Sequence, residues 1–86
     1  MTTEEFLRRL GAGKVVNCTY QRGELTGLIS AWAHKGQFIL TWEECKAGRQ
    51  YDEHAFTRDE RHVFDTAEKV LAFVERSAFP VSEFTP

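Results

Sequence analysis

The 86-residue chain has only two cysteines and lacks any long apolar run. No segment approaches the roughly 20 consecutive apolar residues that span a bilayer. The opening stretch MTTEEFLRRL has no basic region followed by an apolar run, so we expect no secretory signal. Cys18 and Cys45 are far apart and match no C-x-x-C pattern, which argues against a zinc knuckle or a thioredoxin-type pair. We therefore expect a cytoplasmic protein with two reduced thiols.

A strong excess of charge of either sign is also missing. The 11 basic residues nearly balance the 13 acidic ones, which leaves a net charge of −2. Binding to nucleic acid or to anionic membranes depends mainly on clustered Lys and Arg, so we expect neither partner. The composition, 42% hydrophobic and 28% charged, is that of an ordinary globular domain. A chain of this length forms one domain, residues 1–86, and buries only roughly 60 to 65% of its unfolded surface.

The motifs of several common catalytic and cofactor sites are absent. There is no G-x-S-x-G motif, and the GAG at 11–13 precedes a predicted strand, whereas a phosphate loop needs a helix there. Zinc sites draw on close pairs such as H-x-x-x-H, but a predicted bend separates His54 from His62. We predict no catalytic residue, no metal, no cofactor and no small-molecule substrate, and therefore no enzyme. The alternative is a small hydrolase or metal-binding protein that uses His54 with Cys45 or Asp52.

Glycine turns and alternating segments define the predicted elements. Thr2 and Glu5 form a capping-box pattern, which favours a helix. Apolar and polar residues then alternate with a period of two between short glycine turns, as in antiparallel strands, and Gly27 predicts a bulge or a close backbone approach. We predict helices at 3–10 and 66–77, strands at 14–21, 25–33, 37–44 and 50–57, and an apolar tail at 79–86. The fold class is α+β, an antiparallel three- to four-stranded meander with the C-terminal helix packed on it, and a strongly bent, barrel-like sheet is its variant.

The stretch YDEHAFTRDERHVFD, residues 51–65, concentrates charged side chains and two of the three histidines. Its charges alternate in sign, which is typical of a solvated surface rather than of a catalytic carboxylate pair. We predict a polar edge strand over 51–56 and a solvated turn over 58–61. A capping box from Asp65 to Glu68 should then start the second helix.

The run VVNCTYQRGELTGLISAWAHKGQFIL, after a short helix, resembles the first motif of Sm-like small barrels, and YDEHAF is similar to their closing strands. The resemblance covers about half of the chain and implies a nucleic-acid-binding small barrel as an alternative function. The acidic residue usual after the second strand is missing, because WAHK at 32–35 stands there, so no RNA-contacting residue is carried over. The order of helix, three strands and helix also allows a double-stranded-RNA-binding topology, but the second helix of that topology should begin with lysines rather than DTAEK.

Aromatic residues make up 13% of the chain and are common anchors of protein interfaces. Trp32 and Trp42 fall on adjacent predicted strands, where they could be cross-strand neighbours. The tail carries Phe79, Val81 and Phe84, which either complete the core or dock on another chain. We predict a non-enzymatic protein-interaction module that forms a homodimer, and inhibitors, immunity-like proteins and mobile-element accessory proteins are examples by analogy of size and charge. The predicted partner-binding residues are Trp32, Trp42, Tyr20, Asp52, Glu53, His54 and Phe84.

Overall fold

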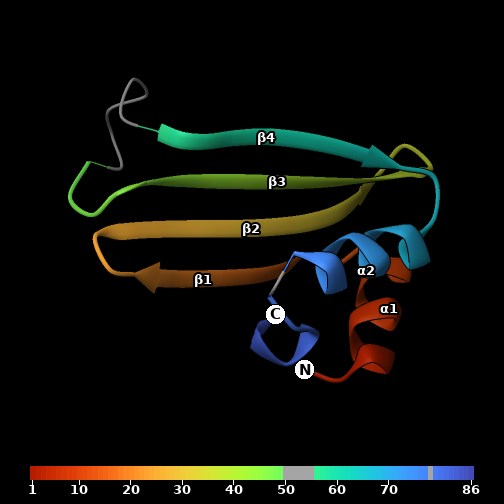
Figure 1. Cartoon of the computed structure of the whole chain (residues 1–86). Coiled ribbons are helices and arrows are strands. Elements are labelled where there is room, and N and C mark those ends of the chain that lie inside the picture. The colour runs from red at the N-terminus through yellow and green to blue at the C-terminus, as the bar shows by residue number, and fades with distance from the viewer. Residues whose placement is uncertain (50–55, 78) are drawn as a thin grey trace.

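A computed structural model describes residues 1–49, 56–77 and 79–86. Its elements are, in chain order, α1 (Thr3–Gly11), β1 (Val16–Arg22), β2 (Leu25–His34), β3 (Gln37–Lys46), β4 (Phe56–Phe64), α2 (Ala67–Arg76) and the 3-10 helix η2 (Val81–Glu83). The strands form one antiparallel sheet in the order β1-β2-β3-β4, as Figure 1 shows. The predicted α+β meander is confirmed. The barrel-like variant is wrong, because β1 and β4 lie at opposite edges of an open sheet.

Tight turns set the register of the first three strands. Gly23 lies in the β1–β2 turn with a φ of 60°. Lys35 and Gly36 join β2 to β3 with φ values of 51° and 79°. Two successive residues at positive φ form a type I′ turn, whose twist matches that of the flanking strands. This turn places His34 opposite Gln37 and thereby fixes which residues share a face of the sheet.

The helices cover one face of the sheet. Successive residues of a strand point to opposite sides, and the buried residues Cys18, Ile29, Leu40 and Trp42 belong to the same core cluster as the helices. Ile39 is also buried but lies outside that cluster, on the other side, which we call the open face. In Figure 1 both helices gather near the end of the sheet where β4 ends, and the end that carries the β1–β2 turn projects beyond them.

Helix α1 begins as its sequence predicts. The Thr2 hydroxyl accepts a hydrogen bond from the Glu5 backbone N–H at 3.1 Å, which satisfies one of the free donors of the first turn. Phe6 and Leu10 are one turn apart and fully buried. A helix of nine residues is too short to be stable alone, so this buried face holds it in place.

Helix α2 begins one residue later than the sequence predicts. Its N-cap is Thr66, whose hydroxyl accepts from the Lys69 backbone N–H at 3.2 Å, and not Asp65. The Asp65 carboxylate instead pairs with the Lys69 ammonium at 2.8 Å. Val70 and Val74 bury the inner face of the helix. Within the described part of the chain, no helix has the length and apolar character needed to cross a membrane.

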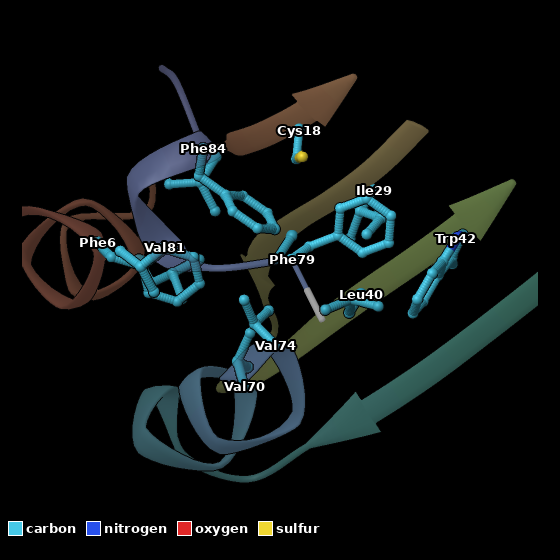
Figure 2. Close-up of a cluster of buried hydrophobic side chains, with 13 residues drawn as sticks. Phe6, Cys18, Ile29, Leu40, Trp42, Val70, Val74, Phe79, Val81 and Phe84 are labelled. Carbon is cyan, nitrogen blue, oxygen red and sulfur yellow. The ribbon is translucent and has the colours of Figure 1, made fainter. Parts of the chain in front are cut away.

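The apolar tail completes the core of its own chain. Figure 2 shows Phe79, Val81 and Phe84 beside α1, α2 and the sheet, and all three are buried. The ring of Phe84 meets that of Phe6 edge-on, with their centroids 5.4 Å apart. Asn17 and Thr85 exchange backbone hydrogen bonds of 2.8 and 2.7 Å along the outer side of β1. Of the two alternatives left open by the sequence, the tail packs on its own domain.

The fourth strand extends further along the chain than predicted. The stretch 58–61, predicted as a turn, lies inside β4, and residues 50–55 of the predicted strand fall outside the described residues. Half-buried and exposed residues alternate throughout β4. The turn prediction was wrong because Arg58, Glu60 and His62 occupy the inner face of β4, so the sequence lacks the apolar alternation that marks a strand.

Candidate functional site

Trp32 and Trp42 lie on opposite faces of the sheet. Trp32 of β2 pairs with Ile39 of β3, whereas Trp42 of β3 pairs with Ile29 of β2. The prediction that they are cross-strand neighbours was therefore wrong, since the β2–β3 turn sets a register that separates them. Trp42 is 3% exposed and belongs to the core, and only Trp32 lies on the open face.

The open face carries an apolar stripe across three strands. Trp32 pairs with Ile39, and Ile39 pairs in turn with Val63 of β4. Directly opposite side chains in an antiparallel sheet lie roughly 5 Å apart, so the three form one continuous surface, which we call the open-face stripe. Ile39, in the middle, is 4% exposed, whereas Val63 is 53% exposed. The stripe is therefore shielded at its centre and accessible at its β4 end.

A histidine lies on one side of the open-face stripe, and charged side chains lie on the other. His34, Glu43, Asp59 and Arg61 are all exposed and share its face of the sheet. Leu28, opposite Glu43, is 37% exposed and extends the apolar surface toward the β1–β2 turn. An apolar centre with a charged rim has the composition of a protein-binding surface.

A shallow hollow lies at the far end of the open face. Its volume is about 280 Å³, and Leu28, Cys45 and Phe56 are among the residues that line it. A bulge between Glu44 and Cys45 interrupts the β3–β4 pairing beside it. The hollow therefore adds apolar lining to the open face at the edge strand.

Tyr20 links three strands on the helix-covered face. Its hydroxyl accepts a hydrogen bond from the Trp42 indole N–H at 2.9 Å and donates one to the Glu44 carboxylate at 2.6 Å. The Thr57 hydroxyl donates to the other oxygen of Glu44 at 2.7 Å. Gly27 faces Tyr20 across the β1–β2 pair, and a methyl group on residue 27 would overlap the tyrosine ring. The sequence predicted a bulge or a close backbone approach at Gly27, and the structure places the side chain of Tyr20 there, beside regular strand pairing. We call Tyr20, Trp42, Glu44 and Thr57 the tyrosine network.

The tyrosine network keeps its acidic groups in fixed charge states. Burial, together with the hydrogen bond to Glu44, raises the pKa of Tyr20 above its usual value. The hydrogen bonds from Tyr20 and Thr57 lower the pKa of the Glu44 carboxyl. Near neutral pH the tyrosine is a protonated donor and the glutamate an ionised acceptor. This pairing stabilises a structural cross-link between strands and does not prepare Tyr20 to act as a nucleophile.

Arginine side chains cover the aromatic rings that extend past the helices. The guanidinium of Arg58 lies 3.6 Å from the ring centroid of Trp42, and that of Arg22 lies 4.2 Å from the centroid of Phe79. Arg58 also donates to Glu60 at 2.6 Å. A hollow of about 320 Å³ beside these groups is lined in part by Trp42, Arg58 and Arg76. Such stacking shields the large rings from water while keeping the charges exposed.

His62 continues this polar row along β4. Its Nε2 lies 2.9 Å from the Glu60 carboxylate, and its ring packs on Phe73 with centroids 4.6 Å apart. The hydrogen bonds from His62 and Arg58 lower the pKa of Glu60. His62 therefore contacts a carboxylate and an aromatic ring. His54, which the alternative hydrolase or metal-binding function would use, lies outside the described residues.

The two cysteines do not form a site with one another. Cys18 is buried on the helix-covered face, and Cys45 is buried on the open face. Burial, with the Glu83 carboxylate adding to it, raises the pKa of the Cys18 thiol, so the thiol stays protonated near neutral pH. Across the described ranges, no three His, Cys, Asp or Glu side chains are arranged to hold a metal ion.

The structure separates the seven predicted partner-binding residues. Phe84 and Trp42 are buried in the core, so neither offers an exposed contact, and Tyr20 is half-buried in its network. Only Trp32 stands on the open face, and Asp52, Glu53 and His54 lie outside the described residues. Sequence reasoning missed Ile39 and Val63. The two-residue alternation in β3 could have identified Ile39 as a residue of the open face. Val63 could not be assigned to a face, because residues 58–61 just before it were predicted as a turn and not as part of a strand.

No protein-family model matches the chain, and no curated protein or solved structure shows a significant similarity to it.

Proposed function

We propose that the protein is a non-enzymatic interaction module whose open face binds protein, a second copy of the chain included. The single observation that carries this proposal is the open-face stripe. One side of the sheet is covered by two helices and the tail, while the other presents Trp32 and Val63 beside a charged rim. Trp is among the residues that contribute most to protein binding.

Two further observations favour binding over chemistry. The polar groups of the helix-covered face are hydrogen-bonded to one another, with Tyr20 protonated and Glu44 ionised near neutral pH. Cys18 is buried and its raised pKa disfavours the reactive thiolate. We place the protein in the cytoplasm, because two free cysteines on opposite faces of a sheet suit a reducing compartment.

Site-specific photo-cross-linking in the producing cells tests the proposal. A photoreactive residue at Thr41, on the open face next to the stripe, should form a discrete protein adduct, whereas one at Glu75, exposed on α2, should not. Trp32→Ala should abolish the adduct, since an aromatic interface anchor contributes about 2 kcal/mol or more to binding. The matched control Val15→Ala removes an exposed apolar side chain outside the stripe and should leave the adduct intact. Equal adducts from both positions, or an adduct that survives Trp32→Ala, would contradict the proposal.

A further inference from the structure

The outer side of β4 is an unpaired sheet edge in the described chain. β4 runs for nine residues and pairs with β3 alone. Alternate residues of such a strand direct their backbone N–H and C=O groups outward, where another strand can bind them. Phe56–Phe64 is therefore long enough to take a further antiparallel strand.

The charges of β4 are arranged symmetrically about its middle residue. Glu60 is the centre of Phe56–Phe64, and Asp59 and Arg61 flank it on the open face. Both flanking side chains are exposed, and neither makes an ion pair with any described residue. A sequence with one negative and one positive charge at equal distances from its centre is complementary to itself when two copies run antiparallel.

We infer that a second copy of the chain binds along β4, antiparallel, with Glu60 opposite Glu60 of the second copy. Asp59 then lies opposite Arg61 of the second copy, and Arg61 opposite its Asp59, on the open face. The two sheets form one continuous sheet of eight strands. The inference goes beyond the proposed function, because the contact lies along the edge of β4 rather than on the open-face stripe.

On the open face, Asp59 and Arg61 favour this register over its neighbours. A shift by one residue would turn the helices of the two copies to opposite sides of the sheet. Shifts by two residues place Asp59 opposite Asp59 or Arg61 opposite Arg61, and like charges directly opposite are destabilising. Charged edge strands usually discourage pairing, but the open-face charges of β4 are complementary to those of a second copy in this register.

The central pair of glutamates has compensating neighbours. Glu60 accepts hydrogen bonds from Arg58 and His62 of its own strand on the helix-covered face. In the proposed register Arg58 and His62 of the second copy stand diagonally opposite it, within reach of long side chains. Thr57 is drawn toward Glu44 at the bulge, so the regular part of the contact runs from Arg58.

Charge reversal tests the register. Asp59→Arg places Arg opposite Arg, and Arg61→Asp places Asp opposite Asp, so each variant alone should weaken self-association by roughly tenfold or more. An equimolar mixture of the two variants restores both opposite-charge pairs in the mixed dimer. Sedimentation velocity over a concentration series should therefore show a dimer for the wild-type chain and for the mixture, and mainly monomer for each variant alone.

Matched controls separate the contact from net charge. Glu24→Arg and Lys14→Asp make the same charge changes at exposed positions away from β4 and should leave the dimer unchanged. A wild-type chain that stays monomeric at every concentration, or a mixture no more dimeric than its components, overturns the β4 contact. In either case the Thr41 adduct remains an independent test of the proposed function. A dimer lost with Trp32→Ala but kept by both charge reversals also overturns the edge contact and assigns self-association to the open-face stripe.

Discussion

At the residue scale, the absence of a side chain at Gly27 determines a contact between distant strands. Tyr20 lies over Gly27 and so reaches Trp42 and Glu44 on β3, two strands away. Residue 27 has an ordinary backbone conformation, and its glycine is required for space rather than for φ. Any larger residue at position 27 would displace the ring of Tyr20.

Gly27→Ala should lower the free energy of unfolding by about 1 to 3 kcal/mol, the range for overpacked sites. The tyrosine ring must move away from the new methyl group and so weakens its bonds to Trp42 and Glu44. Urea unfolding followed by circular dichroism measures the loss. Gly11→Ala is the matched control, because a methyl group there meets nothing within contact distance. Equal stabilities of the two variants would show that the tyrosine ring relaxes at no cost.

At the element scale, strand β4 shows what the sequence predicts and what it leaves open. The glycine turns located β1, β2 and β3 well, since a tight turn and a two-residue period are both local signals. β4 follows the stretch 50–55 and has a polar inner face, so its pattern resembled a turn. The sequence alone could not predict which face of the sheet carries Trp32 and which carries Trp42. A shift of one residue in the pairing of two strands moves every side chain of the shifted strand to the other face.

The Glu60 carboxylate of β4 should make stability depend on pH. Its pKa is lowered in the folded chain, so the unfolded chain binds the proton more readily, and the stabilisation is present above pH 5 and lost as the pH falls through the folded pKa. Glu60→Gln removes this contribution. The difference in free energy of unfolding between wild type and Glu60→Gln should be largest above pH 5 and shrink toward pH 3.

Carbon-detected NMR titration of the Glu60 side chain gives a direct check. The carboxyl should titrate below its ordinary pKa of 4.5, and His62→Ala should raise that pKa, because His62 is the largest contributor to the shift. A Glu60 carboxyl that titrates at or above 4.5 in the wild-type chain would show that Arg58 and His62 do not stabilise its ionised form.

At the scale of the whole molecule, a chain of 86 residues has little apolar area to spare. The tail is therefore part of the minimal core rather than an appendage. Phe84 closes the space beside Phe6 of α1, and Thr85 pairs with Asn17 of β1. The two ends of the chain thus meet in one cluster, as the adjacent termini in Figure 1 show.

Phe84→Ala should cost about 3 to 5 kcal/mol, the range for a buried aromatic ring replaced by a methyl group. Domains of this size have only about 5 to 15 kcal/mol of stability in total, so the variant should unfold at a much lower urea concentration. Val15→Ala, at an exposed position, should lie within about 0.5 kcal/mol of wild type. If both substitutions cost the same, the tail does not contribute to the core as described.

The Asn17–Thr85 bridge makes the two edges of the sheet unequal. It occupies the first outward-directed position of β1, the shorter edge strand, while β4 has no such cover among the described residues. Among the described residues, β4 is therefore the longer edge and the less covered one. In the proposed pair, the two β4 edges lie between the copies, and the β1 edges, each covered at Asn17, face solvent. A fibre built from such pairs would have to grow from β1, the shorter and partly covered edge of the sheet.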